Sequence, residues 1–537
     1  MHESPVLIVG AGPTGLVLGI ELARRTIPFR LIDRLGERQR WSRAIFIKPR
    51  SLEIFASLGL IDAFLECGQI VRGVDLFSDD NNACGYRFGA LDTPYPFILS
   101  LPQDQTERIL NTQLEALGGR VERGVEFMGL EQSESTVQVR LRSETAGEEV
   151  AQFGWVVGAD GCHSTVRSAI NASLEGRDYP QLWGVVDAGI SRWQHPREIT
   201  CVQLQPFFAA LFPRGEDRWR IYFRADSHSD EVLAEIAQRV AVMCPAAEFH
   251  GPEHLSFFHS ESRAVNRFRS GRVLLAGDAA HLSNPFEAHG MNSGMQDAHN
   301  LGWKLACAVL GEATQTLIES YHDERQLVAQ AVLKSGDQLE TRVFETGDRG
   351  RQEFINFVST TEGQQFAALA ESELQYGYPE SPIVAELGPA PASSVRGTKI
   401  GFRVGDAEDL LAQRGRFRLH ELLAGAHHTL LFLLGDAGQP AVKKALSSLT
   451  NTLRSSSRTY AVLRSRTAPD PFPDNLLLDT EGKLHDRLAL DGPNLCLIRP
   501  DGHLGFRCEP PSLGMLSKYL ERLFLPNREP AHTLFRR

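Results

Sequence analysis

A glycine motif near the start of the chain constrains its fold more than any other feature. Residues 10–15 form a GxGxxG pattern. This pattern follows an apolar run at 5–9 and precedes a segment with the apolar spacing of a helix, 16–25, and a second apolar run, 29–32. Strand, glycine turn, helix and strand make a βαβ unit, which predicts an α/β fold with a parallel sheet.

The three glycines of such a motif have separate roles. Gly10 allows a tight turn, Gly12 lets backbone N–H groups approach a pyrophosphate at the positive end of the helix, and Gly15 allows close packing of helix on strand. Asp33 ends the second strand, where its carboxylate can accept a hydrogen bond from a ribose 2′-OH. An ordinary glycine-rich turn has the same motif, but with these elements in order the segment predicts an adenine dinucleotide. Asp33 favours FAD or NAD over NADP.

Two later segments favour FAD. An apolar strand at 273–276 runs into Gly277, and Asp278 can then accept hydrogen bonds from the hydroxyls of a ribityl chain; capping a helix is its alternative role. Gly290, Met291 and Asn292 open a long helix, whose N-terminal dipole can stabilise negative charge on a reduced flavin.

A further segment, 158–167, joins a strand at 155–158 to a helix. Asp160 stands at the strand end and is followed by Ser164 and Arg167, so the segment can cap the helix and pair charges near the pyrophosphate. A plain strand–turn–helix with a surface arginine explains the same pattern.

Composition excludes several classes of protein. The 537 residues include 56 Lys and Arg against 67 Asp and Glu, and a net charge of −11 argues against a nucleic-acid partner. The 8 cysteines contain no CxxC pair and no zinc spacing, so we expect reduced thiols and no metal site. The apolar start lacks a charged n-region and is interrupted by Pro13, so we expect a cytoplasmic protein without a membrane span.

The rest of the chain divides by pattern. Aromatic-rich, strand-like segments at 179–262 predict a sheet inserted into the nucleotide-binding fold, and 316–370 has the spacing of amphipathic helices. The small, proline-rich stretch 388–394 predicts a linker. Beyond it, apolar runs at 429–434 and 495–499 predict strands of a separate small α/β domain.

These motifs together resemble those of a known family. GxGxxG at 10–15, GADGxxSxVR at 158–167 and GDAAH…P…GMNxGxQDAxNLxWKL at 277–305 are typical, in this order, of the FAD-dependent aromatic hydroxylases. The chain resembles the class A flavoprotein monooxygenases, in the branch of phenol hydroxylase and the aromatic polyketide hydroxylases, over residues 5–380. The segment 497–502 resembles the end of the thioredoxin-like domain of that branch, without CxxC, so we expect packing or homodimer contacts there.

The resemblance implies three structural parts. A Rossmann-like FAD-binding domain would comprise residues 1–75, 101–179 and 263–387, and an inserted β-sheet substrate domain residues 76–100 and 180–262. Residues 1–387 would thus form the monooxygenase region, 388–396 a linker, and 397–537 a C-terminal thioredoxin-like α/β domain.

The resemblance also implies cofactor contacts. Arg43 and Gln103 would contact FAD, Thr14 and Arg34 its phosphates or adenosine, and Val125 its adenine. Asp160 would lie in a segment tied to both FAD and nicotinamide binding.

The flavin loop would run from Pro285 to Gly290, and it departs from the family pattern. Glu287 and Ala288 replace two usual glycines, which brings a carboxylate close to the expected flavin. A carboxylate that faces a ring that becomes anionic on reduction is repelled, so we expect Glu287 to turn toward the substrate or solvent, or to pair with a cation.

The reaction implied is hydroxylation of a small aromatic substrate, phenolic or polyketide-like. NADH or NADPH would reduce FAD, and O2 would give a flavin C4a-hydroperoxide that transfers oxygen. No catalytic base is identified; Arg43, Tyr222 and His289 are candidates. The phenylalanines at 207, 208, 212, 223, 257 and 258 suit a flat apolar ligand, although core packing explains most of them. Epoxidation or oxygen insertion on a non-phenolic secondary metabolite is an alternative, as is a flavin-binding NAD(P)H oxidase or redox sensor.

Overall fold

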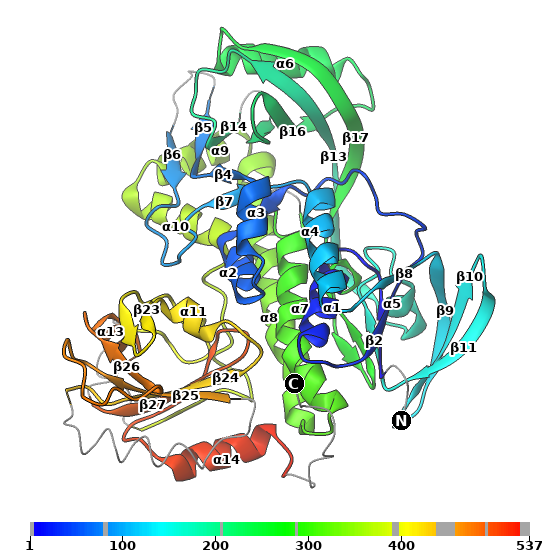
Figure 1. Cartoon of the computed structure of the whole chain (residues 1–537). Coiled ribbons are helices and arrows are strands. Elements are labelled where there is room, and N and C mark those ends of the chain that lie inside the picture. The colour runs from blue at the N-terminus through cyan, green and yellow to red at the C-terminus, as the bar shows by residue number, and fades with distance from the viewer. Residues whose placement is uncertain are drawn as a thin grey trace.

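The computed structural model describes residues 5–78, 84–204, 208–284, 288–388, 397–436, 457–488 and 492–526. Figure 1 shows an N-terminal sheet on the right, a large sheet at the top, central helices and a C-terminal sheet at the lower left. Phe207, Pro285, Glu287 and residues 389–396 of the predicted linker lie outside the described residues. Within the described ranges, no helix is long and apolar enough to cross a membrane.

The N-terminal sheet has six strands in the order β18-β19-β12-β1-β2-β8. Its central strand β1 (Val6–Val9) is fully buried and pairs in parallel with β2 (Phe29–Asp33) and β12 (Trp155–Gly158). The other strands are β8 (Val121–Arg123), β18 (Arg269–Ser270) and β19 (Val273–Leu275). The strands predicted at 5–9, 29–32, 155–158 and 273–276, and their parallel pairing, are confirmed.

Two helices pack on each other beside this sheet. α1 (Pro13–Ala23) begins earlier than its apolar spacing predicts, because Pro13 at the first helical position has a preset φ and needs no N–H partner. α7 (Gly290–Val309) is the predicted long helix and is buried along most of its length. α1 starts at the glycine turn that follows β1, and Gly290 at the start of α7 lies near Asp278, which follows β19.

Smaller elements flank these helices. Two three-stranded sheets have the orders β11-β10-β9 and β3-β7-β4. Their bounds are β9 (Val125–Gln132), β10 (Val137–Ser143), β11 (Gly147–Phe153), β3 (Phe46–Ile47), β4 (Gln69–Val71) and β7 (Ile98–Ser100). The other helices in this part of the chain are α2 (Pro49–Ser57), α3 (Ile61–Cys67), α4 (Gln103–Ala116) and α5 (Thr165–Ala169).

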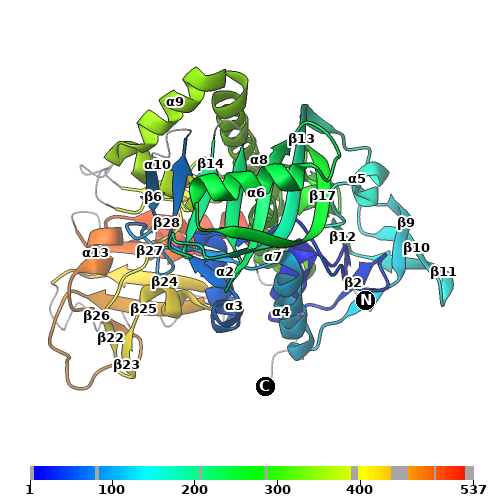
Figure 2. The ribbon, with the colours of Figure 1, turned by 90° about the horizontal axis from the view of Figure 1, so that it is seen from above.

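The large sheet has eight strands in the order β20-β17-β13-β16-β15-β14-β5-β6. Its two long strands, β13 (Leu174–Ser191) and β17 (Glu248–Val265), pair antiparallel, and α6 (Val232–Met243) lies across one face (Figure 2). The remaining strands are β5 (Gly73–Phe77), β6 (Cys84–Arg87), β14 (Ile199–Gln203), β15 (Ala209–Pro213), β16 (Arg218–Ala225) and β20 (His281–Leu282).

Side-chain alternation gives this sheet two different faces. Phe223 and Phe257 pack under α6, whereas Phe208, Phe212 and Phe258 belong to a cluster on the opposite face. Of the six phenylalanines predicted to suit a flat ligand, five are described: two pack on the α6 side, and three share the other face.

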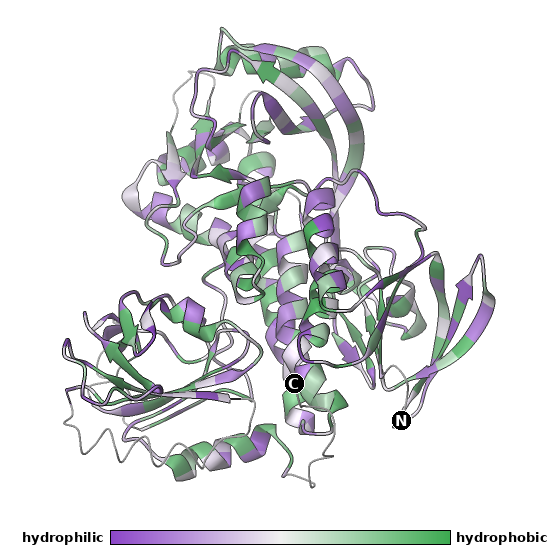
Figure 3. Ribbon diagram, in the orientation of Figure 1, coloured by the Kyte–Doolittle hydropathy of each residue, from purple (hydrophilic) through white to green (hydrophobic). Residues whose placement is uncertain are grey.

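The helices predicted within 316–370 are confirmed. They are α8 (Gln315–Glu340), a π-helical turn η3 (Thr341–Glu345), α9 (Gly347–Val358) and α10 (Thr361–Ser372). Hydrophilic and hydrophobic residues alternate along α8 in Figure 3, as expected for an amphipathic helix.

The C-terminal sheet has eight strands in the order β21-β28-β27-β24-β25-β26-β22-β23. β24 (His428–Leu433), β25 (Ser457–Leu463) and β26 (Leu476–Asp479) are parallel, whereas β27 (Asn494–Ile498) and β28 (Leu504–Cys508) run antiparallel. The strands predicted at 429–434 and 495–499 are confirmed. The other elements are β21 (Ala385–Leu387), β22 (Leu410–Ala412), β23 (Gly415–Phe417), α11 (Leu419–Leu423), α13 (Lys483–Leu488) and α14 (Leu513–Leu523).

Candidate functional site

The glycine turn has the shape that a pyrophosphate needs. A methyl group on Gly10 would overlap the backbone of Ala159, and one on Gly15 would overlap the carbonyl oxygen of Gly10. A methyl group on Gly12 would instead meet no described atom within 4 Å. Gly12 is the N-cap residue of α1 and has no side chain to bond its first N–H groups, so the helix end is open to an anion.

Asp33 holds the glycine turn from the neighbouring strand. Its Oδ2 accepts a hydrogen bond from the N–H of Ala11 at 2.9 Å, and its Oδ1 accepts one from the N–H of Leu35 at 2.9 Å. Arg123, which the sequence analysis did not single out, places its Nη1 at 3.7 Å from Oδ2. An ionised carboxylate has further lone pairs, so Asp33 can still accept a ribose hydroxyl.

Arg34 and Val125 flank a backbone hydrogen bond, in which the N–H of Gly124 donates to the carbonyl oxygen of Leu35 at 3.2 Å. Arg34 directly follows β2 and is exposed, and Val125 begins β9 and is half-buried. Both positions are accessible to a ligand that extends from the glycine turn past Asp33.

The Gly277 turn meets the glycine turn at Thr14. A methyl group on Gly277 or on Gly294 would overlap the Thr14 hydroxyl, so these segments are in direct contact. Asp278 lies in a short 3-10 turn and keeps an exposed surface. Desolvation by nearby protein atoms, and then the charge of Asp297, raise the pKa of Asp278 above its ordinary value.

Asp160 caps α5. Its Oδ1 accepts from the Ser164 hydroxyl at 2.5 Å, and its Oδ2 accepts from the N–H of Thr165 at 2.8 Å. Arg167 reaches from α5 to the carbonyl oxygen of Ala279 at 3.2 Å, which joins this segment to the Gly277 turn. The structure thus brings all three motifs together, with Asp160 acting as a cap.

The residues in the first turn of α7 differ in their burial. Gly290 and Met291 are half-buried, whereas Asn292 is fully buried. The Asn292 side chain accepts from the N–H of Lys48 at 3.0 Å and donates to the carbonyl oxygen of Phe46 at 2.8 Å. Its amide therefore fixes the chain before α2 against α7, and Gly290 and Met291 remain to face a ligand.

His289 lies in a buried polar cluster that the sequence analysis missed. Its Nδ1 is 2.6 Å from Glu373 Oε1 and 3.0 Å from Lys48 Nζ, and all three side chains are buried. Glu373 has a φ of 59°, a left-handed conformation that side chains other than glycine rarely adopt. A lysine directly after the buried strand β3 is the one local signal that could have indicated this cluster.

Arg43, Gln103 and Tyr222 come together at the junction with the large sheet. Gln103 Oε1 accepts from the Ser42 hydroxyl at 2.7 Å, and the Tyr222 hydroxyl donates to the carbonyl oxygen of Arg43. The Arg43 guanidinium lies 4.3 Å from the ring centre of Phe258. Desolvation raises the pKa of Tyr222 to about 12, so this hydroxyl stays protonated at neutral pH.

A buried carboxylate, Glu340, links the large sheet to the end of strand β20. Its Oε2 accepts from Asn284 Nδ2 at 2.9 Å, and its Oε1 is 3.3 Å from Arg224 Nη1. Desolvation raises the pKa of Glu340 above its ordinary value. Arg224 also lies over the ring of Trp183, so the polar group borders the aromatic face.

No cluster of His, Cys, Asp and Glu within the described ranges could hold a metal ion. The glycine turn leaves open space at Gly12, and the aromatic face of the large sheet reaches Arg43 through Phe258 and Tyr222.

Known proteins resemble the chain along most of its length. The family described as FAD binding domain matches residues 3–335. The chain is 33% identical to 6-methylpretetramide 4-monooxygenase of Streptomyces rimosus, over 97% of this chain and 93% of the relative. It is 29% identical to pentachlorophenol 4-monooxygenase of Sphingobium chlorophenolicum, over 94% of both. The flavin-dependent monooxygenase PieE, solved in complex with FAD and substrate, has a similar fold, with a TM-score of 0.78 and 23% identity over 97% of this chain and 99% of that one.

Proposed function

The chain belongs to the FAD-binding-domain family and is an FAD-dependent monooxygenase of the aromatic hydroxylase type, and on that premise we propose its substrate class and site. The enzyme uses NADH or NADPH and O2 to hydroxylate a phenolic or polyketide-like aromatic compound. The observation that supports this most is the contact of Arg43 with Phe258 and Tyr222 of the aromatic face, beside Ser42, which bonds Gln103 of α4.

The residues present fit FAD. The open space at Gly12 and the N-terminus of α1 would hold the pyrophosphate, Asp33 the ribose, and Asp278 the ribityl hydroxyls. Arg43 and Gln103 would border the ring, and Gly290 and Met291 at the start of α7 would face its polar edge. Bound FAD supplies the redox chemistry: it takes two electrons from the nicotinamide and activates O2.

The aromatic face suits a flat substrate. Phe208, Phe212, Tyr222 and Phe258 belong to, or pack against, the cluster on the face of the large sheet opposite α6. Apolar walls at this place exclude water, and their planes orient a ring. The half-buried Phe212 and Phe258 would contact it, while the buried Phe208 supports them.

The Tyr222 hydroxyl donates its hydrogen bond to the Arg43 carbonyl, so a group other than Tyr222 would transfer the proton in the reaction. His289 Nδ1, between Lys48 and Glu373, is the site where we place an exchangeable proton. Nδ1 cannot donate to Glu373 and accept from Lys48 at once, so a change in protonation changes which partner it bonds.

The C-terminal region is proposed to be a thioredoxin-like domain, with the division at 388–396 expected from the sequence. Its support is the topology: parallel β24 and β25, then antiparallel β27 and β28, then α14. Without a CxxC pair, its role is structural.

A product assay tests the function. The purified protein is supplied with FAD, 18O2 and either NADH or NADPH. It is then incubated with a panel of phenols, naphthoquinones and polyketides, and the products are measured by mass spectrometry. We expect substrate-stimulated nicotinamide oxidation and products that carry one 18O atom. Oxidation that yields only hydrogen peroxide across the panel would instead indicate an oxidase.

A further inference from the structure

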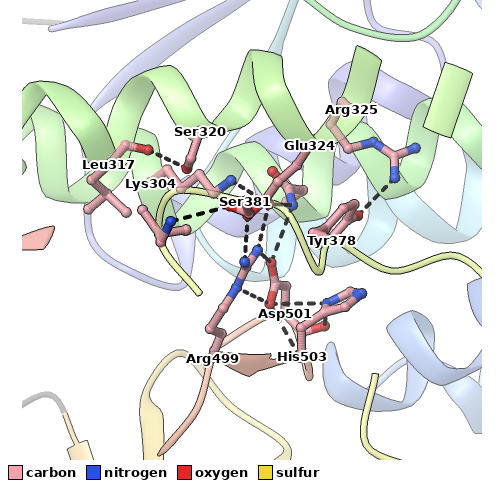
Figure 4. Close-up of polar contacts among 12 residues, drawn as sticks. Lys304, Leu317, Ser320, Glu324, Arg325, Tyr378, Ser381, Arg499, Asp501 and His503 are labelled. Carbon is pink, nitrogen blue, oxygen red and sulfur yellow. Dashed lines mark hydrogen bonds and ion pairs between the residues drawn. The ribbon is translucent and has the colours of Figure 1, made fainter. Parts of the chain in front are cut away.

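Four buried charged residues join the C-terminal sheet to the central helices (Figure 4). Arg499 at the end of β27 binds Glu324 of α8 through both carboxylate oxygens, at 2.6 and 2.8 Å. Its Nε also donates to Asp501 Oδ1 at 3.0 Å, and Lys304 of α7 places its Nζ at 2.7 Å from Glu324 Oε2. We call Lys304, Glu324, Arg499 and Asp501 the Arg499 cluster; no side chain in it is more than 1% exposed.

The cluster is balanced in charge, but burying it opposes folding. Removing ions from water is costly, and apolar residues of similar volume often stabilise a fold as well as a buried ion pair does. Unlike apolar packing, directional two-point hydrogen bonds fix the relative position of the two elements that they join. We therefore infer that the cluster sets the position of the C-terminal sheet relative to helices α7 and α8.

The backbone of α8 and a set of hydrogen bonds connect the cluster to the Gly277 turn. Arg325, the next residue of α8 after Glu324, donates from Nε to Asp297 Oδ1 at 2.5 Å. Asp297 Oδ2 then accepts from the N–H of Gly277 at 2.9 Å and lies 2.7 Å from His281 Nε2. Asp297 is the only group in this path that touches the turn directly with its side chain.

Tyr378 connects the two ends a second time. Its hydroxyl lies 3.0 Å from Arg325 Nη1, and its ring centre lies 5.5 Å from the Arg499 guanidinium. Tyr378 is buried and precedes β21, which pairs with β28 of the C-terminal sheet. Arg499 thus contacts Glu324, the residue before Arg325 in α8, and Tyr378, one of the hydrogen-bond partners of Arg325.

We propose that Arg499 is a positioning residue for FAD, through which the C-terminal sheet sets the place of the Gly277–Asp278 turn. Gly277 has a φ of 61°, so the turn requires a left-handed residue whose N–H is held by Asp297. If α8 moves relative to α7, Arg325 releases Asp297 and the Asp278 carboxylate loses its fixed position. The inference rests on the proposed role of Asp278 in holding the ribityl chain.

Conservative variants of the full-length protein test this. Arg499→Lys keeps the charge but removes the two-point contact, and Tyr378→Phe removes only the hydroxyl on Arg325. Arg507→Lys is the matched control, because Arg507 is a buried arginine of the same sheet whose partners, Glu386, Thr398 and Leu488, lie outside α7 and α8. Asp278→Ala reports on the turn itself.

Three readouts are compared: the Kd of the apo-protein for FAD, the visible circular dichroism of the bound flavin, and the melting temperature of the apo-protein. We expect Arg499→Lys and Tyr378→Phe to raise the Kd about 3- to 30-fold and to alter the flavin spectrum. Arg507→Lys should lower the melting temperature while it leaves the Kd and the spectrum unchanged.

The outcomes separate the inference from its premise. If Asp278→Ala weakens FAD binding but Arg499→Lys and Tyr378→Phe do not, the positioning role is wrong. The inference also fails if Arg507→Lys weakens binding as much as Arg499→Lys. If Asp278→Ala leaves the Kd unchanged, the proposed role of the turn is wrong and the inference falls with it. Should Arg499→Lys fail to fold, Tyr378→Phe decides alone.

Discussion

Gly12 and Gly15 share one turn but are glycine for different physical reasons. At Gly15 a side chain would overlap the Gly10 carbonyl, so the fold itself requires glycine there. At Gly12 the space is open, and the backbone dihedrals (φ −75°, ψ −175°) suit any residue. On the proposed pyrophosphate site, we therefore expect the requirement at Gly12 to come from the ligand.

This difference predicts opposite effects of two small changes. Gly12→Ala should leave the melting temperature of the apo-protein nearly unchanged but weaken FAD binding at least tenfold, because the methyl group occupies the pyrophosphate space. Gly15→Ala should lower the apo-protein melting temperature by several degrees, since overpacking of a buried contact costs about 1–3 kcal/mol. Thermal melts and FAD titration measure both; a Gly12→Ala protein with normal FAD affinity would contradict the assignment.

Tyr222 is a hydrogen-bond donor at every pH where the enzyme is expected to work. Its pKa is raised to about 12 by desolvation, and its hydroxyl bonds the Arg43 carbonyl. Tyr222→Phe should therefore lower kcat/KM by about tenfold or less through the lost bond of roughly 1 kcal/mol, with the shape of the pH–rate profile unchanged between pH 6 and 9. Loss of a basic limb from that profile would show that Tyr222 titrates in the reaction.

At the scale of elements, neighbouring strands and helices place groups that are distant in sequence. α8 holds Glu324 toward the C-terminal sheet and Arg325 toward Asp297 of α7. β27 and β28 are buried throughout, and each carries one cysteine. Burial raises the pKa of Cys496 to about 12 and raises that of Cys508, so both thiols are protonated and unreactive at neutral pH.

The buried thiols predict that the C-terminal sheet has no redox role. The double variant Cys496→Ser, Cys508→Ser should retain nicotinamide-driven hydroxylation, with a lower melting temperature because buried hydroxyls replace apolar sulfur. Cys496 donates to Asn494 Oδ1 at 3.2 Å, and Cys508 donates to the carbonyl oxygen of Ser512 at 3.9 Å. A serine hydroxyl can maintain the shorter contact more readily, so most of the loss should come from Cys508. A folded, flavin-loaded double variant without turnover would overturn this prediction.

For the whole molecule, stability at low pH depends on the contact between the C-terminal sheet and the helices. His428 lies between Trp303 and Phe524, with ring centres 5.3 and 5.7 Å away, and desolvation lowers its pKa to about 3. His503 beside Asp501 has a pKa lowered to about 4 by the same cause. Both imidazoles are neutral in the folded protein and charge on unfolding below pH 6.5.

The sign of the pH dependence follows. Between pH 6.5 and the lowered pKa values of His428 and His503, the unfolded chain binds more protons than the folded protein. The free energy of unfolding therefore decreases as the pH falls through this range. Each histidine contributes a slope of about 1.4 kcal/mol per pH unit, fully developed below pH 6. His428→Leu should reduce the slope of the unfolding free energy by about that amount between pH 6 and 4.5. Urea titrations at several pH values measure it; an unchanged slope would place the protonation elsewhere.

Much of the nucleotide half of this protein was predictable from its sequence. The strands at 6–9, 29–33, 155–158 and 273–275, the helix after the glycine turn and the exclusion of a CxxC site depend on local spacing and residue type. Apolar periodicity and the conformational needs of glycine act within a few residues, so they can be read in order along the chain.

Only the tertiary structure decided which polar groups bond to other parts of the fold. Asn292 accepts a hydrogen bond from the N–H of Lys48, which follows β3, and Asp160 caps α5. His289 contacts Glu373, 84 positions away. Arg499 reaches Glu324 across 175 positions. Such partners are selected by how helices and sheets pack, and a buried charge finds its counterion wherever packing places one. No local pattern encodes that choice, because its free energy is realised only in the assembled fold.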